Sequence, residues 1–306
     1  MSPSPPPAVP DERAGIGFGV LAYAMWGVLP LYWHVIEDVP AVQITAFRIL
    51  FCGLFLMLAA AVRGRFSRVI FILTTPALIG RLALTAVLIA ANWTIFIYSV
   101  ASHQIVESSL GYYILPLLSI ALGVMLFGER LSRLRLLAIG LAAAVVAAQA
   151  LALGRLPWIA LALALSFGFY GYFRKLIAVD PLDGLLVEML VLLPVVLGAI
   201  VFWGAAGQLA FTTATPLRDL MLAGAGPVTA IPLGLFAAAA QRIRLSTLGF
   251  LQYLSPSISL VIAIVWLGEA FTLVNAITFG CVWSALMLVA AEGQMGRLRA
   301  RRVPGE

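Results

Sequence analysis

Apolar stretches of about 20 residues, separated by short polar segments, follow one another along almost the whole chain. A stretch of this length crosses the roughly 30 Å hydrocarbon core of a bilayer as an α-helix. The stretches between charged residues and Pro/Gly clusters predict ten spans: residues 16–36, 41–62, 79–99, 105–127, 134–152, 156–174, 183–203, 220–240, 246–267 and 273–291. The predicted fold class is therefore an all-α membrane protein with ten transmembrane helices.

The composition agrees with this pattern and limits what lies outside the membrane. Hydrophobic residues make up 63% of the 306 residues and charged residues only 10%, whereas soluble domains carry about 25% charged residues. The longest connectors, 63–78 and 204–219, are too short for a soluble catalytic or sensory domain. Residues 1–14 are Pro-rich and predict a disordered tail rather than a signal peptide, and residues 293–306 predict a basic cytoplasmic tail.

The basic residues alternate between the predicted loops. Of the 19 Lys and Arg residues, only Arg155 and Arg218 fall in loops on one side of the membrane, and Arg48 lies within a span. Because basic loops are retained in the cytoplasm, both termini are predicted to be cytoplasmic. The net charge of +6 thus follows from topology and does not predict a nucleic-acid partner. The C-terminal RLRARR, residues 297–302, is predicted to anchor the topology, with contact to anionic membrane lipid as the alternative.

The two halves of the chain carry the same landmarks in the same order. A constant or nearly constant offset relates Tyr113 to Tyr253, Pro116 to Pro256, Ser119 to Ser259, Gly128 to Gly268, Glu129 to Glu269, Gly140 to Gly280, Gly27 to Gly168 and Pro40 to Pro181. Each copy holds five spans, so the second enters the membrane from the opposite side. Accordingly, the basic RLSRLR after Glu129 is replaced by AFTLVN after Glu269. Residues 15–152 and 153–292 are predicted to be inverted five-helix repeats, which are typical of secondary transporters with a site near the midplane.

Charged groups within the spans are candidate functional residues, because each is costly unless it faces protein or water. Arg48 is either a structural anchor or a group that recognises an anion. Glu188 lies at a similar depth measured from the opposite face, roughly 10 Å away in height, so the two are not predicted to pair. Glu107 opens the fourth span, where either the helix dipole explains it or it is a titratable gate. Glu107 and Glu188 are therefore the candidates for coupling or gating.

Aromatic and amide side chains in the spans suit a pocket for a small amphipathic solute. The candidate binding residues read from the spans are Arg48, Asn92, Trp93, Tyr112, Tyr113, Gln252 and Tyr253. Hydrogen bonding between helices explains Asn92 equally well. The candidate helix breaks are Pro116, Pro227, Pro232 and Pro256, because each proline removes a backbone donor. By this reasoning the segment GAGPVTAIP, residues 224–232, is predicted to be the broken helix.

Catalytic and cofactor motifs are missing from the sequence. It has no Walker A motif, no histidine pair at metal-ligand spacing and no G-x-S-x-G, and Cys52 and Cys281 both fall inside predicted spans. We therefore predict no catalytic residue, no metal and no cofactor, and we do not expect an enzyme. Two alternatives to a carrier remain open: a passive channel, and a membrane enzyme that acts on lipid head groups with Arg48 holding a phosphate.

A family resemblance rests on five stretches: WGVLPLY (26–32), NWTIFIYSV (92–100), ESSLGYYILPLLS (107–119), GPVTAIPL (226–233) and LSTLGFLQYLSP (245–256). In these stretches the chain resembles the EamA-type transporters of the drug/metabolite transporter superfamily, especially the RarD-like branch. The resemblance implies two inverted repeats in the bacterial inner membrane and the export or exchange of a small metabolite or drug-like solute without ATP. It also adds Trp26 and Tyr32 to the candidate binding residues.

The sequence departs from the family at two positions. Leu115 stands where the family has an asparagine before the proline, and His34 stands where it has a lysine. A hydrogen-bonding role at Leu115 is therefore not expected. The identity of the solute, coupling to protons or to a counter-solute, and a homodimer are all left open by the sequence.

Overall fold

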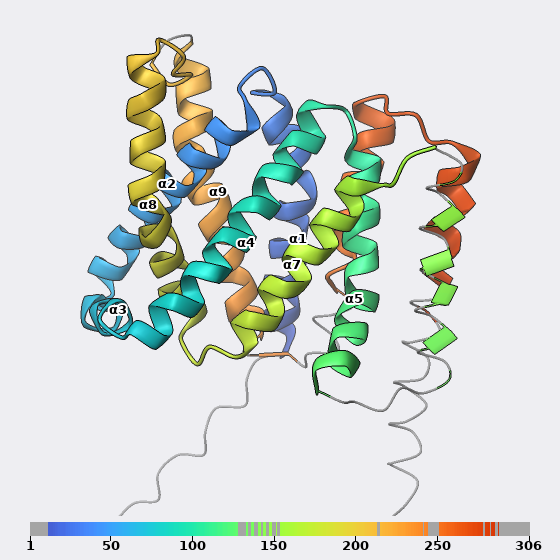
Figure 1. Ribbon diagram of the computed structural model, residues 1–306, viewed down its shortest axis with the longest axis horizontal. Helices are drawn as coiled ribbons and strands as arrows, with labels where there is room; N and C mark the ends of the chain where they lie inside the picture. Colours follow the sequence, from blue (N-terminus) through green and yellow to red (C-terminus); the bar gives the residue numbers. More distant parts are fainter. Residues whose placement is uncertain are drawn as a thin grey trace, which may run out of the picture.

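The computed structural model describes residues 12–127, 154–212, 215–240, 242–243 and 251–277, with separate residues between 133 and 151 and between 279 and 287. The regular elements in these ranges are all helices (Figure 1). They are α1 Glu12–His34, α2 Ala41–Val62, α3 Phe66–Leu73, α4 Pro76–Ala101, α5 Ile105–Phe127, α7 Trp158–Lys175, α8 Pro181–Ala205, α9 Pro216–Ala240, α11 Leu254–Val261 and the π-helix η1 Ile262–Trp266. The predicted all-α class is confirmed for this part of the chain.

Five of these helices, α1, α2, α4, α8 and α9, are long and apolar enough to cross a membrane. The predicted spans 105–127 and 156–174 correspond to α5 and α7, and the span 246–267 corresponds in part to α11 and η1. The predicted spans 134–152 and 273–291 lie largely outside the described residues. The chain is a multi-pass membrane protein, and the count of ten spans stays a prediction.

The connector 63–78 holds a helix that the hydropathy pattern did not predict. Helix α3 has 8 residues and is therefore only about 12 Å long, too short to cross the bilayer. Val69 and Ile72 are buried, whereas Ile70 and Phe71 are 57% and 64% exposed. A short helix with apolar side chains on both its protein and its outer faces is suited to lie at the membrane surface.

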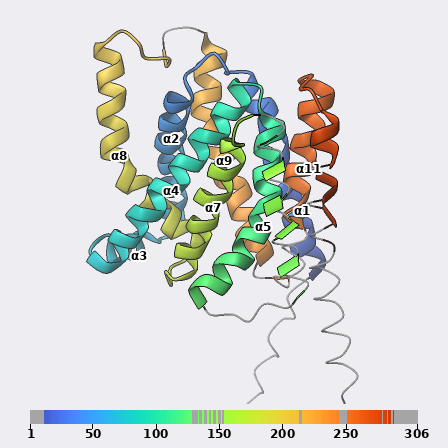
Figure 2. The same cartoon turned by 45° about the vertical axis from the view of Figure 1, so that its right-hand side comes forward.

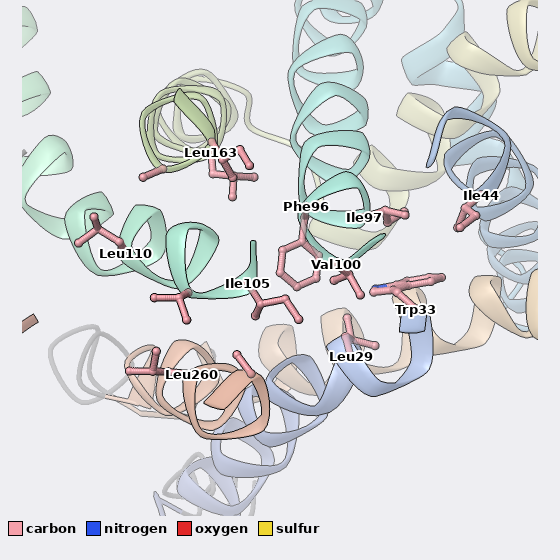
Figure 3. Close-up of a cluster of buried hydrophobic side chains, with 14 of the residues drawn as sticks. Leu29, Trp33, Ile44, Phe96, Ile97, Val100, Ile105, Leu110, Leu163 and Leu260 are labelled. Carbon is pink, nitrogen blue, oxygen red and sulfur yellow. The ribbon is translucent and has the colours of Figure 1, made fainter. Parts of the chain in front are cut away.

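Helix α2 holds a central place in the packing. It contacts α4, α8 and α9, while α1 packs against α9 and α11, and α7 packs against α4 and α5. Figure 2 shows α1, α5 and α11 grouped on one side and α8 at the far edge. Side chains from α1, α2, α4, α5, α7 and α11 meet in the cluster drawn in Figure 3. Because lipid is as apolar as these side chains, close van der Waals packing has to hold the helices together.

Three of the four predicted helix breaks are wrong. Helix α5 continues through Pro116, and α9 continues through Pro227 and Pro232. A proline removes one backbone hydrogen bond. Helix α9 nevertheless stays continuous, because it packs against α1 and α2 along its length. The interruption near Pro256 is present, and it comes earlier: residues 252–253 form a turn, and Pro256 lies in the first turn of α11, where proline is tolerated.

Candidate functional site

Arg48 is held in the interior of the helix bundle. It lies on α2 and is 4% exposed, and its Nε donates a hydrogen bond of 2.8 Å to Thr229 Oγ1 of α9. Thr229 donates its own hydroxyl proton to the carbonyl oxygen of Ala225 at 2.8 Å, so its lone pairs are free to accept from Arg48. This contact fixes the guanidinium between α2 and α9.

Aromatic rings surround the Arg48 guanidinium. Its Cζ lies 4.0 Å from the ring centroid of Trp93 on α4 and 5.2 Å from that of Trp33 on α1. Such cation–π contacts contribute up to about 2 kcal/mol when water is excluded. The Tyr32 ring packs on Trp33, and the Tyr112 hydroxyl is hydrogen-bonded to Asn92, the residue before Trp93. Helices α1, α2, α4, α5 and α9 therefore all contribute to this group, which we call the Arg48 site: Tyr32, Trp33, Arg48, Trp93, Tyr112 and Thr229.

Asn92 connects the Arg48 site to α7. Its Nδ2 donates to the carbonyl oxygen of Leu163 at 3.1 Å and to Ser166 Oγ at 3.0 Å. Its Oδ1 accepts from the Tyr112 hydroxyl at 3.3 Å. The same amide thus joins α4 to α7 and orients one wall of the site.

The other candidate binding residues lie in separate groups. Tyr113 is 1% exposed, its hydroxyl is hydrogen-bonded to Ser257 Oγ, and its ring stacks on that of Tyr253 at 6.0 Å between centroids. Trp26 packs with Tyr23 and Phe236, and Gln252 lies in the turn before α11. Tyr113 and Tyr253 therefore act as packing between helices in this conformation.

Glu188 forms a second buried polar cluster, away from Arg48. It is 0% exposed on α8 and accepts from Thr85 Oγ1 at 2.7 Å and from the Tyr170 hydroxyl at 3.3 Å. Its ion-pair partner is Arg174, with Nε 3.6 Å from Oε1. The expectation that Arg48 and Glu188 do not pair agrees with these contacts.

Several residues of the two clusters were missed by the sequence analysis: Trp33, Thr85, Tyr170, Arg174 and Thr229. Arg174 is the last residue of the predicted span 156–174, where a basic side chain is expected to face the cytoplasm. Its long side chain instead turns back along α7 to the buried carboxylate. Thr229 lies in the segment GAGPVTAIP, and a hydroxyl between the two prolines is the sequence signal that points to it.

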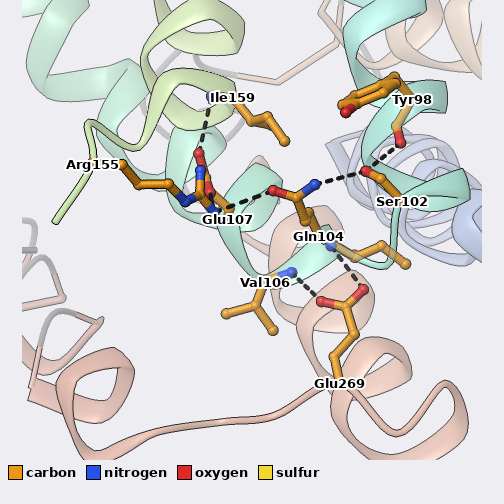
Figure 4. Close-up of polar contacts among 9 residues, drawn as sticks. Tyr98, Ser102, Gln104, Val106, Glu107, Arg155, Ile159 and Glu269 are labelled. Atoms are coloured by element: carbon orange, nitrogen blue, oxygen red, sulfur yellow. Dashed lines mark hydrogen bonds and ion pairs between the residues drawn. The ribbon is translucent and has the colours of Figure 1, made fainter. Parts of the chain in front are cut away.

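Two carboxylates close the end of the bundle where α5 and α7 begin (Figure 4). Glu107 accepts from the Ile159 amide at 3.0 Å and pairs with Arg155 at 3.1 Å. Glu269 accepts from the amides of Ile105 and Val106, both at 2.8 Å. Each carboxylate therefore satisfies orphan amides at the start of a helix in the other half of the chain.

An ion-pair cluster joins the two halves of the chain at the opposite end of the bundle, where α2 ends and α8 begins. Arg65, between α2 and α3, pairs with Asp180 at 3.1 Å and with Asp183 at 3.4 Å. The hydrogen bond to Asp180 raises the pKa of Arg65. Burial opposes ionisation of Asp180, but the hydrogen bonds from Arg65 and from the amides of Leu182 and Asp183 outweigh it and lower the pKa of Asp180. The pair is therefore charged near neutral pH.

The pKa of Glu269 predicts that the stability of the protein depends on pH, through the end of the bundle where α5 and α7 begin. Burial raises the pKa of Glu269 above its ordinary value of 4.5, although the amides of Val106 and Ile105 oppose this shift. The folded state therefore holds the proton more tightly than the unfolded chain, so Glu269 makes stability fall as the pH rises above about 4.5. The variant Glu269→Gln is expected to lose this part of the slope in unfolding midpoints measured from about pH 4 to about pH 7. Equal slopes in this variant and in the wild type, with the exposed Glu12→Gln as control, would contradict the assignment.

The apolar helix bundle with its enclosed polar groups defines a multi-pass membrane protein, and the comparisons identify its family. Residues 13–148 match the EamA-like transporter family. An uncharacterized transporter of Vibrio cholerae is 40% identical over 95% of this chain and 97% of its own length. Protein RarD of Salmonella typhimurium is 42% identical over 92% of this chain and 96% of its own length. The chain belongs to the EamA-type transporters, RarD-like branch, of the bacterial inner membrane.

A solved structure supports the fold independently. A protein crystal structure that is 18% identical superimposes with a TM-score of 0.60 over 92% of this chain and 98% of that chain. At this identity the similarity concerns the fold alone.

Proposed function

We propose that the protein is a secondary active carrier that moves a small organic solute across the inner membrane by alternating access. In this proposal the ten predicted spans form two inverted five-helix repeats, residues 15–152 and 153–292, with both termini in the cytoplasm. The solute binds at the Arg48 site, and a gradient of protons or of a counter-solute supplies the driving force. Export or exchange is the direction that the family resemblance favours.

The observation that carries this proposal is that contacts of one half recur in the other half with the roles exchanged. A Cβ added to Gly27 on α1 would lie 2.7 Å from Ile258 on α11, and one added to Gly168 on α7 would lie 2.9 Å from Leu118 on α5. Gly168 is the repeat counterpart of Gly27, and Ile258 is that of Leu118. Helix α7 is the repeat counterpart of α1, and α9 is that of α4. The contact of α1 with α9 in one half therefore recurs as the contact of α7 with α4. This pattern supports inverted repeats.

Tyr113 and Tyr253 support the same arrangement. These counterparts stack on each other with an angle of 9° between their rings. Two equivalent residues contact each other only where a twofold axis passes between them. The crossing of α5 and α11 would then lie on the pseudo-twofold axis, which suits a pivot for rocking motions of the two repeats.

The polar contacts at the two ends of the bundle support alternating access. Arg65–Asp180 at one end, and Glu107–Arg155 and Glu269–Ile105 at the other, each join the first repeat to the second. Contacts of this kind have to break and form again when the two halves rock, whereas contacts within one repeat are retained. The conformation described here has both ends linked.

The proposal is tested with purified protein in liposomes. A carrier gives saturable flux that accelerates when unlabelled solute is present on the opposite side, whereas a passive channel does not show this acceleration. If protons are coupled through the candidate carboxylates, Glu107→Gln or Glu188→Gln abolishes gradient-driven accumulation and leaves exchange intact. Unchanged accumulation in both variants would exclude these two residues as coupling groups. No flux of any amino acid, carboxylate, amine or sugar by folded protein under any ion gradient would refute the carrier.

A further inference from the structure

The starting point is the uncompensated charge of Arg48. A buried guanidinium is costly unless an anion neutralises it, and among the described residues no carboxylate lies within ion-pair distance of Arg48. The carboxylates near the bundle interior have other partners. Glu188 binds Arg174, Glu107 binds Arg155, Asp183 binds Arg65, and Glu269 binds the first amides of α5.

The protein engages only one side of the Arg48 guanidinium by hydrogen bonding. Its Nε is engaged by Thr229, and the rings of Trp93 and Trp33 lie 4.0 and 5.2 Å from Cζ. In the described part of the chain, neither terminal amino group donates to a protein acceptor. Two parallel N–H groups at the end of an arginine match the two oxygens of a carboxylate.

The second repeat provides an internal comparison. Arg48 and Glu188 lie at the same depth from the first residues of their helices, Ala41 and Pro181. Glu188 is neutralised by Arg174, and the counterpart of Arg174 in the first repeat is Trp33, an uncharged residue. Glu188 therefore has a counter-ion within the protein, whereas Arg48, at the same distance from the start of its own helix, has none among the described residues.

From these contacts we propose that Arg48 is the counter-ion of the transported solute and that the solute is a small organic monocarboxylate. This inference rests on the proposed carrier function and specifies its solute class. One guanidinium neutralises one negative charge, which favours a monoanion over inorganic phosphate or a dicarboxylate. The walls formed by Trp93, Trp33 and Tyr112 favour an aromatic or apolar body on the carboxylate.

The first test uses ligands of matched shape and needs no variant. Benzoate, benzamide, benzylamine and inorganic phosphate are added to the purified protein in nanodiscs, and the unfolding midpoint is measured. Benzoate is expected to raise the midpoint, as are indole-3-acetate and hexanoate, whereas benzamide, benzylamine and phosphate are not. The inference is overturned if no carboxylate shifts the midpoint at about 10 mM, or if benzamide shifts it as much as benzoate.

The second test assigns the effect to Arg48. Arg48→Gln is expected to weaken benzoate binding by about 10- to 100-fold, because a charge-assisted pair is lost. Arg48→Lys, which keeps the charge but not the paired donors, should fall between this variant and the wild type. Arg68→Gln, which removes an arginine from the exposed side of α3, is the matched control and should bind as the wild type does. Benzoate binding that is equal in Arg48→Gln and Arg68→Gln would refute the role of Arg48.

Transport separates this inference from the carrier function. Saturable exchange of benzamide or benzylamine that is unchanged in Arg48→Gln would leave the carrier intact and overturn the carboxylate class. Binding of benzoate through Arg48 without flux of any solute would support the anion site and refute the carrier.

Discussion

Glu188→Ala is expected to lower the free energy of unfolding by about 3–5 kcal/mol, the largest effect predicted for a single polar side chain here. Glu188 is 0% exposed and holds the hydroxyls of Thr85 and Tyr170 as well as the guanidinium of Arg174. Removing the carboxylate leaves Arg174, whose side chain is 13% exposed, as an uncompensated charge among α4, α7 and α8. Chemical unfolding in detergent micelles measures the loss.

The pair of variants Glu188→Leu and Arg174→Met provides the control. If the cost of Glu188→Ala comes from the stranded guanidinium, removing both charges should restore most of the stability, because apolar replacement of a whole buried pair is often neutral. Thr85→Val, which removes one hydrogen bond to the carboxylate, should cost only about 1 kcal/mol. A double variant that is less stable than either single variant would contradict this account.

Gly226→Ala is expected to destabilise the protein by about 2–3 kcal/mol or more, through overpacking. Gly226 lies where α9 crosses α2, and an added Cβ would lie 2.4 Å from the carbonyl oxygen of Phe51 and 2.9 Å from the amide nitrogen of Cys52. Both atoms belong to the backbone and cannot rotate away, so the two helices would have to separate. The shift would also move Arg48 and Thr229, which join the same two helices.

Gly234→Ala in the same helix is the matched control for that substitution. An added Cβ there meets no atom within 4 Å, so alanine should be neutral or should stabilise α9 by up to about 1 kcal/mol through its higher helix propensity. Unfolding midpoints that are equal for Gly226→Ala and Gly234→Ala would show that the close approach of α2 and α9 is not required.

The sequence identified several residues of the site, but it did not show which of them contact each other across different helices. Hydropathy identified Arg48, Asn92 and Glu188 as unusual because each is costly in a span. It did not indicate that Thr229 would hold Arg48, since those residues lie on helices far apart in the chain. Arg174 ends the predicted span 156–174, where the sequence suggests a basic group that faces the cytoplasm, but its long side chain turns back into the protein.

Local rules also gave the wrong result where neighbouring helices override them. The prolines of α9 predicted a break, yet the helix continues through Pro227 and Pro232. The opposite error occurred at residues 66–73, where a connector without a full apolar span contains α3. A hydropathy window as long as a membrane span averages over such a short helix and cannot detect it.

The sequence by itself determined that this chain is an all-α membrane protein of the EamA type, because apolar length, basic loops and family motifs are properties of the chain read in order. The tertiary structure alone decided which polar residues meet: Arg48 with Trp93 and Thr229, and Glu188 with Arg174. The physical reason is that helix packing brings together residues distant in sequence, and only this packing determines whether a buried charge finds its counter-ion within the protein.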